Sequence, residues 1–245
     1  MATIRQNKLS DMQAGIPAGT PVDRQQLAAM GISADLAVHY VRAGWLRRLA
    51  RGTYIRPGED LALHPTLVFL QAHVRGLHVG GKSALEWHGV RHYLSQRPVL
   101  QLFGWDAAKL PAWFTEKFPA HYHRKRLFSE EPAAPRHVGS FEQKEDAPQT
   151  SAPERALLEM LDEVGVRQTL TEAEQLVEST YNLRAKVLNE LLQHCTRVKT
   201  VRLCLQLGQQ KDMPWVTKID TQALPRGSER PWIGRSPDGL LVLKR

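Results

Sequence analysis

Cysteine is scarce in this sequence: among 245 residues there are two, Cys195 and Cys204. Two thiols nine positions apart in a leucine-rich stretch are too few for a disulfide framework or a four-ligand zinc site, and they suit a reducing cytoplasm. No apolar run approaches the roughly 18 residues that cross a bilayer, and the first eight residues lack the apolar core of a secretory signal. We therefore expect a cytoplasmic protein with no membrane partner and no bound metal.

The sequence does contain an excess of positive charge. Lysine and arginine number 33 against 25 acidic residues, a formal net charge of +8, which points to a polyanionic partner. The excess is concentrated, because the stretch from Arg42 to Arg56 has five arginines and no acidic residue. With 42% hydrophobic residues the chain can bury a core, and its length predicts one or two folded units.

Three helices are predicted at the beginning of the chain. The first covers Ile4–Gln13 and ends before the breakers of Gly15–Gly19. The second begins after Asp23, whose carboxylate can cap the free amides of the first turn, and runs to Met30. A tight turn at residues 31–33 then leads to the third.

The third helix is predicted over Ala34–Ala43. Gly31 supplies the left-handed backbone position that suits a helix end, and Ser33 supplies the next cap. Helical spacing gives the helix an apolar face, which consists of Leu36, Ala37, Tyr40 and Val41.

A small hairpin follows this helix. Trp45–Leu49 and Thr53–Arg56 are short β-prone runs on either side of the turn Ala50-Arg51-Gly52. Helix, turn, helix and an arginine-bearing hairpin within sixty residues form the layout of a winged helix-turn-helix. We therefore predict such a DNA-binding domain at residues 1–60.

In a helix-turn-helix the second helix of the motif enters the major groove and reads base edges, while nearby cations contact phosphate. The predicted base-reading residues on the outer face of the third helix are Ser33, Ala34, Asp35, Val38, His39 and Arg42. The predicted phosphate-binding residues of the wing are Arg47, Arg48, Arg51 and Thr53. The alternative is a winged helix that binds another protein, with these arginines as a solvated face.

The rest of the chain, residues 63–245, predicts a larger and mainly helical α+β domain. We expect Phe128–Gln149 to be a loop and the final run, Trp232–Leu243, to be a hairpin that turns at Pro237-Asp238-Gly239. Helices are expected at residues 63–74, 82–88 and through most of 151–211, and a strand at 98–103. Three residues are expected to cap helices: Ser151 and Glu154 as a capping box, and Asn182.

Several short runs resemble the AbiEi antitoxins, the transcriptional-regulator half of type IV toxin–antitoxin systems. The most specific are Gly44-Trp45-Leu46 after the third helix and Arg51-Gly52-Thr53-Tyr54 in the wing. Shorter matches later in the chain are Ser83-Ala84-Leu85, His88-Gly89 and Pro153–Glu159. The resemblance implies a winged helix that binds inverted repeats in the promoter of its own operon and represses it. It also implies a C-terminal domain that opposes a nucleotidyltransferase-like toxin without a stable complex, and neither enzymatic activity nor a cofactor.

A competing motif lies at Gly76–Ser83, which matches the P-loop pattern at every position. In a nucleotide-binding enzyme, Lys82 would contact the terminal phosphate, Ser83 would bind magnesium, and Asp106 could hold the metal. The preceding segment is too polar for a buried parallel strand, and the strand–helix alternation of a P-loop sheet is missing downstream. We interpret Gly80-Gly81 as a turn before a helix and keep the enzyme as the alternative hypothesis.

The remaining candidates are histidines that could bind a metal and a second run of cations that could bind nucleic acid. His88 and His92 are four residues apart, but Gly89 separates them and the glutamate of the metalloprotease motif is missing. His121 and His123 precede Arg124-Lys125-Arg126, which could form a second basic patch on nucleic acid. Exposed strand residues at the edge of a basic surface explain this run equally well.

Overall fold

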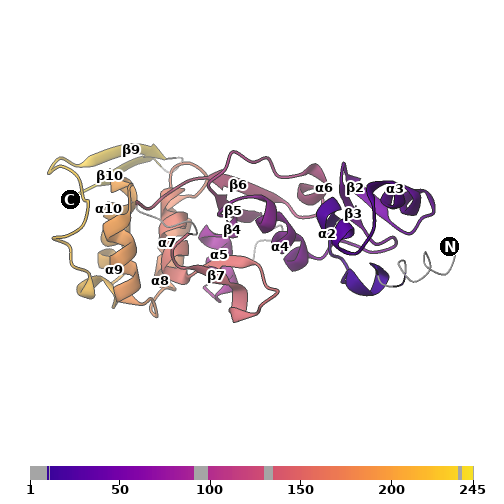
Figure 1. The fold of residues 1–245 in the computed structure, drawn as a ribbon. Helices are drawn as coiled ribbons and strands as arrows, with labels where there is room; N and C mark the ends of the chain where they lie inside the picture. The colour runs from indigo at the N-terminus through magenta and orange to yellow at the C-terminus, as the bar shows by residue number, and fades with distance from the viewer. Residues whose placement is uncertain (1–9, 11, 91–98, 130–134, 237–238, 245) are drawn as a thin grey trace.

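The computed structural model describes residues 10, 12–90, 99–129, 135–236 and 239–244. The molecule is elongated, with the N-terminal unit at one end and the C-terminal hairpin at the other (Figure 1). Helices and strands alternate irregularly along the chain, so the predicted α+β fold class is confirmed. None of the described helices is long and apolar enough to cross a membrane.

The N-terminal unit contains a helix-turn-helix backed by a small antiparallel sheet. Its helices are α2 (Arg24–Ala29) and α3 (Ala34–Arg42), and its strands are β1 (Val22–Asp23), β2 (Arg47–Ala50) and β3 (Thr53–Ile55). The strand order is β1–β3–β2, so the hairpin β2–β3 is joined to the strand that precedes α2. The predicted helix Ile4–Gln13 lies mostly outside the described residues, although residues 12–15 are helical.

Local capping explains where these helices begin and how the turn between them forms. The Asp23 carboxylate accepts the backbone N–H of Gln26, and the Gln26 side chain accepts the N–H of Asp23, a complete capping box. The Ser33 hydroxyl accepts the N–H of Leu36 at the start of α3. Gly31 adopts a φ of 76°, as the turn requires. The sequence predicted both caps and the turn.

Two separate hydrophobic clusters lie along the chain. The N-terminal cluster includes Met12, Leu27, Tyr40 and Tyr54, and the second begins at Leu67 and continues through Leu243. The two units are also joined by polar contacts: Asp23 lies 2.9 Å from the His73 ring, and Lys117 lies 2.8 Å from Asp60. The clusters divide close to residue 60, although the domain boundary itself stays a prediction.

The second unit begins with α4 (Leu63–His73), which leads to a five-stranded mixed sheet. The strands are β4 (His78–Val79), β5 (Leu100–Gly104), β6 (Ala120–Arg124), β7 (Val138–Ser140) and β8 (Gln149–Ser151), in the order β6–β5–β4–β8–β7. Helices α5 (Gly81–Trp87) and α6 (Ala112–Thr115) lie in the connections. The predicted loop at Phe128–Gln149 is wrong in part, because β7, a short 3-10 turn and the beginning of β8 lie within it.

Helix α7 (Pro153–Asp162) forms the centre of the C-terminal part. Its residues from Glu154 to Asp162 are all buried, so this helix has no solvent-exposed face. Around it lie α8 (Leu170–Glu178), α9 (Ala185–His194) and α10 (Val198–Gln210).

The predicted side-chain caps of α7 and α9 are wrong. Ala152 precedes α7 and Arg184 precedes α9, and neither supplies a side-chain cap. The Ser151 hydroxyl donates to Glu159, and Glu154 accepts hydrogen bonds from Arg184 instead. Both side chains of the expected capping box are therefore used in tertiary contacts, which local sequence patterns do not contain.

The chain ends in a two-stranded hairpin, β9 (Trp232–Ser236) and β10 (Gly239–Leu243), as predicted. Two residues of its expected turn, Pro237 and Asp238, lie outside the described residues. The buried guanidinium of Arg202 on α10 donates to the backbone carbonyls of Arg226, Ser228, Arg230 and Leu243. A single side chain thus fixes the terminal segment to the helices.

Candidate nucleic-acid interface

Helix α3 presents a continuous exposed face at the end of the molecule. All six residues predicted to read bases are exposed: Ser33, Ala34, Asp35, Val38, His39 and Arg42. On the opposite side Ala37 and Tyr40 are fully buried, and Leu36 and Val41 are partly buried. The helix therefore turns its apolar side inward and leaves a mixed polar and small surface outside.

Two aromatic contacts support the C-terminal half of the exposed face of α3. The His39 ring meets the Trp45 ring edge to face, with centroids 6.1 Å apart, and Trp45 also packs on buried Tyr40 at 5.3 Å. Trp45 itself is 37% exposed. Trp45 is not among the residues predicted to bind DNA, yet its ring contacts His39, which is one of the predicted base-reading residues.

The hairpin β2–β3 carries its cations on the outside. Arg47, Arg48 and Arg51 are exposed, and Thr53 is half-buried. The Arg47 guanidinium donates to the Glu59 carbonyl at 3.0 Å, and Arg48 Nε donates to the Ala50 carbonyl at 3.2 Å. Because the acceptors are neutral carbonyl groups, these hydrogen bonds do not neutralise the positive charges of Arg47 and Arg48.

Arg56, the fifth arginine of the basic stretch, has an internal role. Its guanidinium donates to the carbonyls of Gln13 and Ile16, at 3.2 and 3.1 Å, and its Nε lies 3.2 Å from the Glu59 carboxylate. It connects the end of the wing to the beginning of the chain. The basic stretch therefore divides into outward arginines and one that stabilises the unit.

The second basic patch is only partly accessible. Arg124 and Arg126 are exposed, and the Arg126 guanidinium lies 4.3 Å from the centroid of the Trp105 ring. Lys125 is different, because its ammonium group donates to the carboxylates of Asp162 and Glu163 on the C-terminal helices. These ion pairs leave Lys125 less available to a phosphate, and a second nucleic-acid contact at Arg124, Lys125 and Arg126 stays a prediction.

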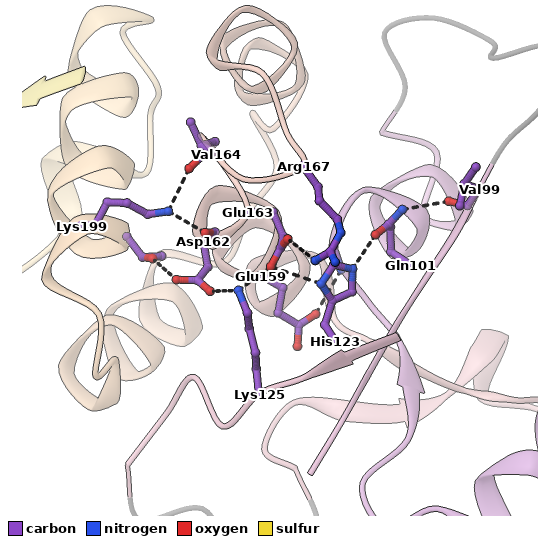
Figure 2. A network of polar contacts seen from close by, with 12 residues as sticks. Val99, Gln101, His123, Lys125, Glu159, Asp162, Glu163, Val164, Arg167 and Lys199 are labelled. Carbon is purple, nitrogen blue, oxygen red and sulfur yellow. Dashed lines mark hydrogen bonds and ion pairs between the residues drawn. The ribbon is translucent and has the colours of Figure 1, made fainter. Parts of the chain in front are cut away.

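Figure 2 shows the network that holds Lys125. His123 is buried, so it is not an exposed strand residue. Its ring lies 2.6 Å from the Gln101 amide oxygen and 3.2 Å from the Glu163 carboxylate. Burial raises the pKa of Glu163, but hydrogen bonds from His123 and Lys125 outweigh that effect and lower the pKa to about 2. His123 in β6 and Lys125 just after it thus join the sheet to the C-terminal end of α7.

The segment that matches the P-loop pattern is used internally. Gly81 N–H donates to the Glu159 carboxylate at 3.1 Å, and Lys82 pairs with Glu172 at 3.1 Å. The Ser83 hydroxyl accepts the backbone N–H of Gln101 at 2.9 Å. The segment before the pattern is helix α4, and strand β4, which lies within the pattern, pairs antiparallel with β5. Groups that would contact phosphate and magnesium in a P-loop therefore contact the protein itself.

Glu159 is the centre of a fully buried cluster that the sequence analysis missed. Its carboxylate accepts hydrogen bonds from Arg155 Nε at 2.7 Å, Ser151 Oγ at 2.8 Å and His78 Nε2 at 2.9 Å, besides Gly81 N–H. Burial raises the pKa of Glu159, but the charges of His78 and Arg155 outweigh it and the pKa falls to about 2. The available signal was the presence of four charged residues, Glu154, Arg155, Glu159 and Asp162, in the helix at residues 153–162.

The glycine pair of the P-loop pattern is explained by this cluster. A Cβ atom on Gly80 would lie 2.3 Å from Glu159 Oε2 and 2.5 Å from the Phe103 ring. Gly81 has a φ of +53°. Both positions therefore require glycine for close packing and backbone conformation, without a bound phosphate.

The remaining candidates are structural. The His88 ring lies 2.9 Å from the Ser151 carbonyl, and its predicted partner His92 lies outside the described residues. The described residues contain no group of three potential metal ligands. Both cysteines are free and buried, as predicted, and burial raises the pKa of Cys195 to about 12.

The order of strand, helix, turn, helix and two-stranded wing places the N-terminal unit in the winged helix-turn-helix class, joined here to a larger α+β unit. Two family models cover nearly the whole chain. The AbiEi antitoxin N-terminal domain matches residues 5–96, and the model of the transcriptional regulator, AbiEi antitoxin of type IV toxin–antitoxin systems, matches residues 97–244. The chain belongs to this family of antitoxins and transcriptional regulators.

Among solved structures, the chain is similar to the RV2827C protein from Mycobacterium tuberculosis. The TM-score is 0.51 with 16% sequence identity, over 96% of this chain and 88% of that one. At this identity the likeness concerns the fold alone. No curated protein matches significantly.

Proposed function

We propose that this antitoxin is a cytoplasmic repressor that binds inverted repeats in the promoter of its own operon. The observation that carries the proposal is the exposed face of α3 beside the exposed arginines of the wing. A major groove about 12 Å wide admits one helix, and the first turns of that helix supply base contacts. Ser33, Ala34, Asp35, Val38 and His39 would lie toward the bases, with Arg42 at the far end, and the buried side of α3 faces the N-terminal core.

The wing would contribute affinity more than sequence preference, because phosphate contacts carry little sequence information. Each neutralised phosphate changes the slope of log affinity against log salt concentration by roughly 0.9. Three arginines on phosphates would therefore account for a slope of about 2.7. This number gives the proposal a quantitative test.

The test compares the wild type with Arg47→Ala/Arg48→Ala/Arg51→Ala on upstream promoter DNA at several salt concentrations. A control with the same loss of charge is Lys186→Ala/Lys218→Ala/Arg230→Ala, which removes three exposed cations from α9, the 3-10 turn at 216–218 and the segment before β9. Helix α9 and strand β9 lie at the other end of the molecule from α3 (Figure 1). We expect the wing variant to flatten the salt dependence by about 2.7 and the control to leave it nearly unchanged. Equal slopes for all three proteins would refute the wing assignment.

We further propose that the C-terminal unit opposes a nucleotidyltransferase-like toxin encoded by the same operon, without a stable complex. Family membership supports this role. Expressed from an unrelated promoter, the wing variant should still rescue cells from the toxin while it no longer represses the native promoter. Loss of rescue in the wing variant would show that the two roles are not separate. Stable co-purification of toxin and antitoxin would favour the alternative of a protein-interaction module.

A further inference from the structure

Val38 is an aliphatic side chain exposed at the centre of the outer face of α3. It is 45% exposed, whereas the apolar residues on the other side of the helix are packed into the N-terminal core. A β-branched residue loses rotamer freedom in a helix, so an exposed valine there adds nothing to the stability of the free protein. Its place at the centre of the exposed face of α3 makes Val38 available to whatever this face binds.

The neighbours of Val38 on this face are small or polar. Ala34 lies one turn earlier and has a short side chain, so another surface can approach closely at this point. Asp35 and His39 flank the pair with hydrogen-bonding groups, and the Trp45 edge contact supports the His39 ring. The result is a small apolar spot beside polar groups, extending from the first turn to the middle of the helix.

In the major groove, the apolar group that a base pair displays is the 5-methyl of thymine, whereas the other features there are hydrogen-bond donors and acceptors. We infer that Val38 determines specificity by contacting the 5-methyl group of a thymine in each half-site. This inference rests on the proposed function, since it requires α3 to lie in the major groove. It adds a named base and a named atom to that proposal.

The experiment removes the methyl group from the DNA and the side chain from the protein separately. In the duplex that footprinting of the promoter defines, each thymine is replaced singly by deoxyuridine, and dissociation constants are measured by fluorescence anisotropy. At one thymine per half-site, the wild type should lose roughly fourfold in affinity, the effect of one buried methyl-sized group. Val38→Ala should bind the thymine and uracil duplexes equally.

Two further variants keep the result interpretable. Val38→Thr keeps one methyl and should retain part of the preference, which separates contact from a folding defect. Val166→Ala removes another exposed valine, on the C-terminal part, and should behave as the wild type.

The inference is overturned if Val38→Ala keeps the wild-type preference for thymine over uracil. It is also overturned if the wild type binds the promoter and no single replacement of thymine by deoxyuridine changes its affinity. It is also overturned if sedimentation shows that Val38→Ala loses self-association and the thymine preference is unaffected, because Val38 would then contact a second copy. If the wild type binds no promoter DNA at all, the proposed function fails together with this inference, a result distinct from the others.

Discussion

The buried cluster around Glu159 offers a sharp test of what holds the C-terminal unit together. In Glu159→Gln the side chain keeps its shape and loses its charge, so buried Arg155 loses its counter-charge. The amide can still accept from some of the four donors that surround the carboxylate. The change therefore isolates charge from packing.

The size of the effect follows from the pKa of Glu159, which is lowered from 4.5 to about 2 in the folded protein. At about 1.4 kcal/mol per unit, the ionised carboxylate contributes about 3 kcal/mol to the free energy of unfolding. Because the folded pKa lies below the unfolded one, this contribution is complete above pH 4.5 and is lost as the pH falls toward 2. Near pH 3 less than half of it remains.

Urea unfolding, monitored by circular dichroism, measures this contribution. At pH 7 we expect Glu159→Gln to be about 3 kcal/mol less stable than the wild type, and the difference to narrow below pH 4.5. The control is Glu172→Gln, which removes the partly exposed pair with Lys82 and should cost less than about 1 kcal/mol. A loss in Glu159→Gln that is no larger than in the control, or that does not change with pH, would refute the electrostatic argument.

Three other predictions concern the N-terminal unit and the P-loop pattern. His39→Ala should lower the ratio of promoter to random-DNA affinity more than it lowers non-specific binding, and equal losses in a competition assay would remove His39 from the base-reading set. Arg56→Ala should lower the stability of the N-terminal unit by about 1–2 kcal/mol, because it breaks hydrogen bonds to Gln13 and Ile16; a flattened salt slope like that of the wing variant would instead place Arg56 on DNA. Calorimetric titration with ATP and magnesium should show no binding, because Lys82 and Ser83 contact the protein; binding that Lys82→Ala abolishes would revive the enzyme hypothesis.

What the sequence determined by itself was the N-terminal unit. Asp23, Ser33 and Gly31 act on backbone groups within three residues of themselves, and the inward and outward faces of α3 follow from helical spacing. Such signals are complete within a short window, so the helix-turn-helix, the wing and the exposure of the candidate residues could be predicted without a fold.

The tertiary structure decided the use of polar residues in the C-terminal unit. Glu159 meets His78 from 81 positions away, and Lys125 meets Asp162 from 37 positions away. Local patterns in this unit matched a P-loop, which was kept as an alternative, predicted a capping box at Ser151 and Glu154, and suggested a basic patch that included Lys125. A local pattern records which groups are present and not which partner reaches them. Burial supplies the reason for the difference: a polar group removed from water must find a partner inside the protein, and that partner is set by how distant segments pack.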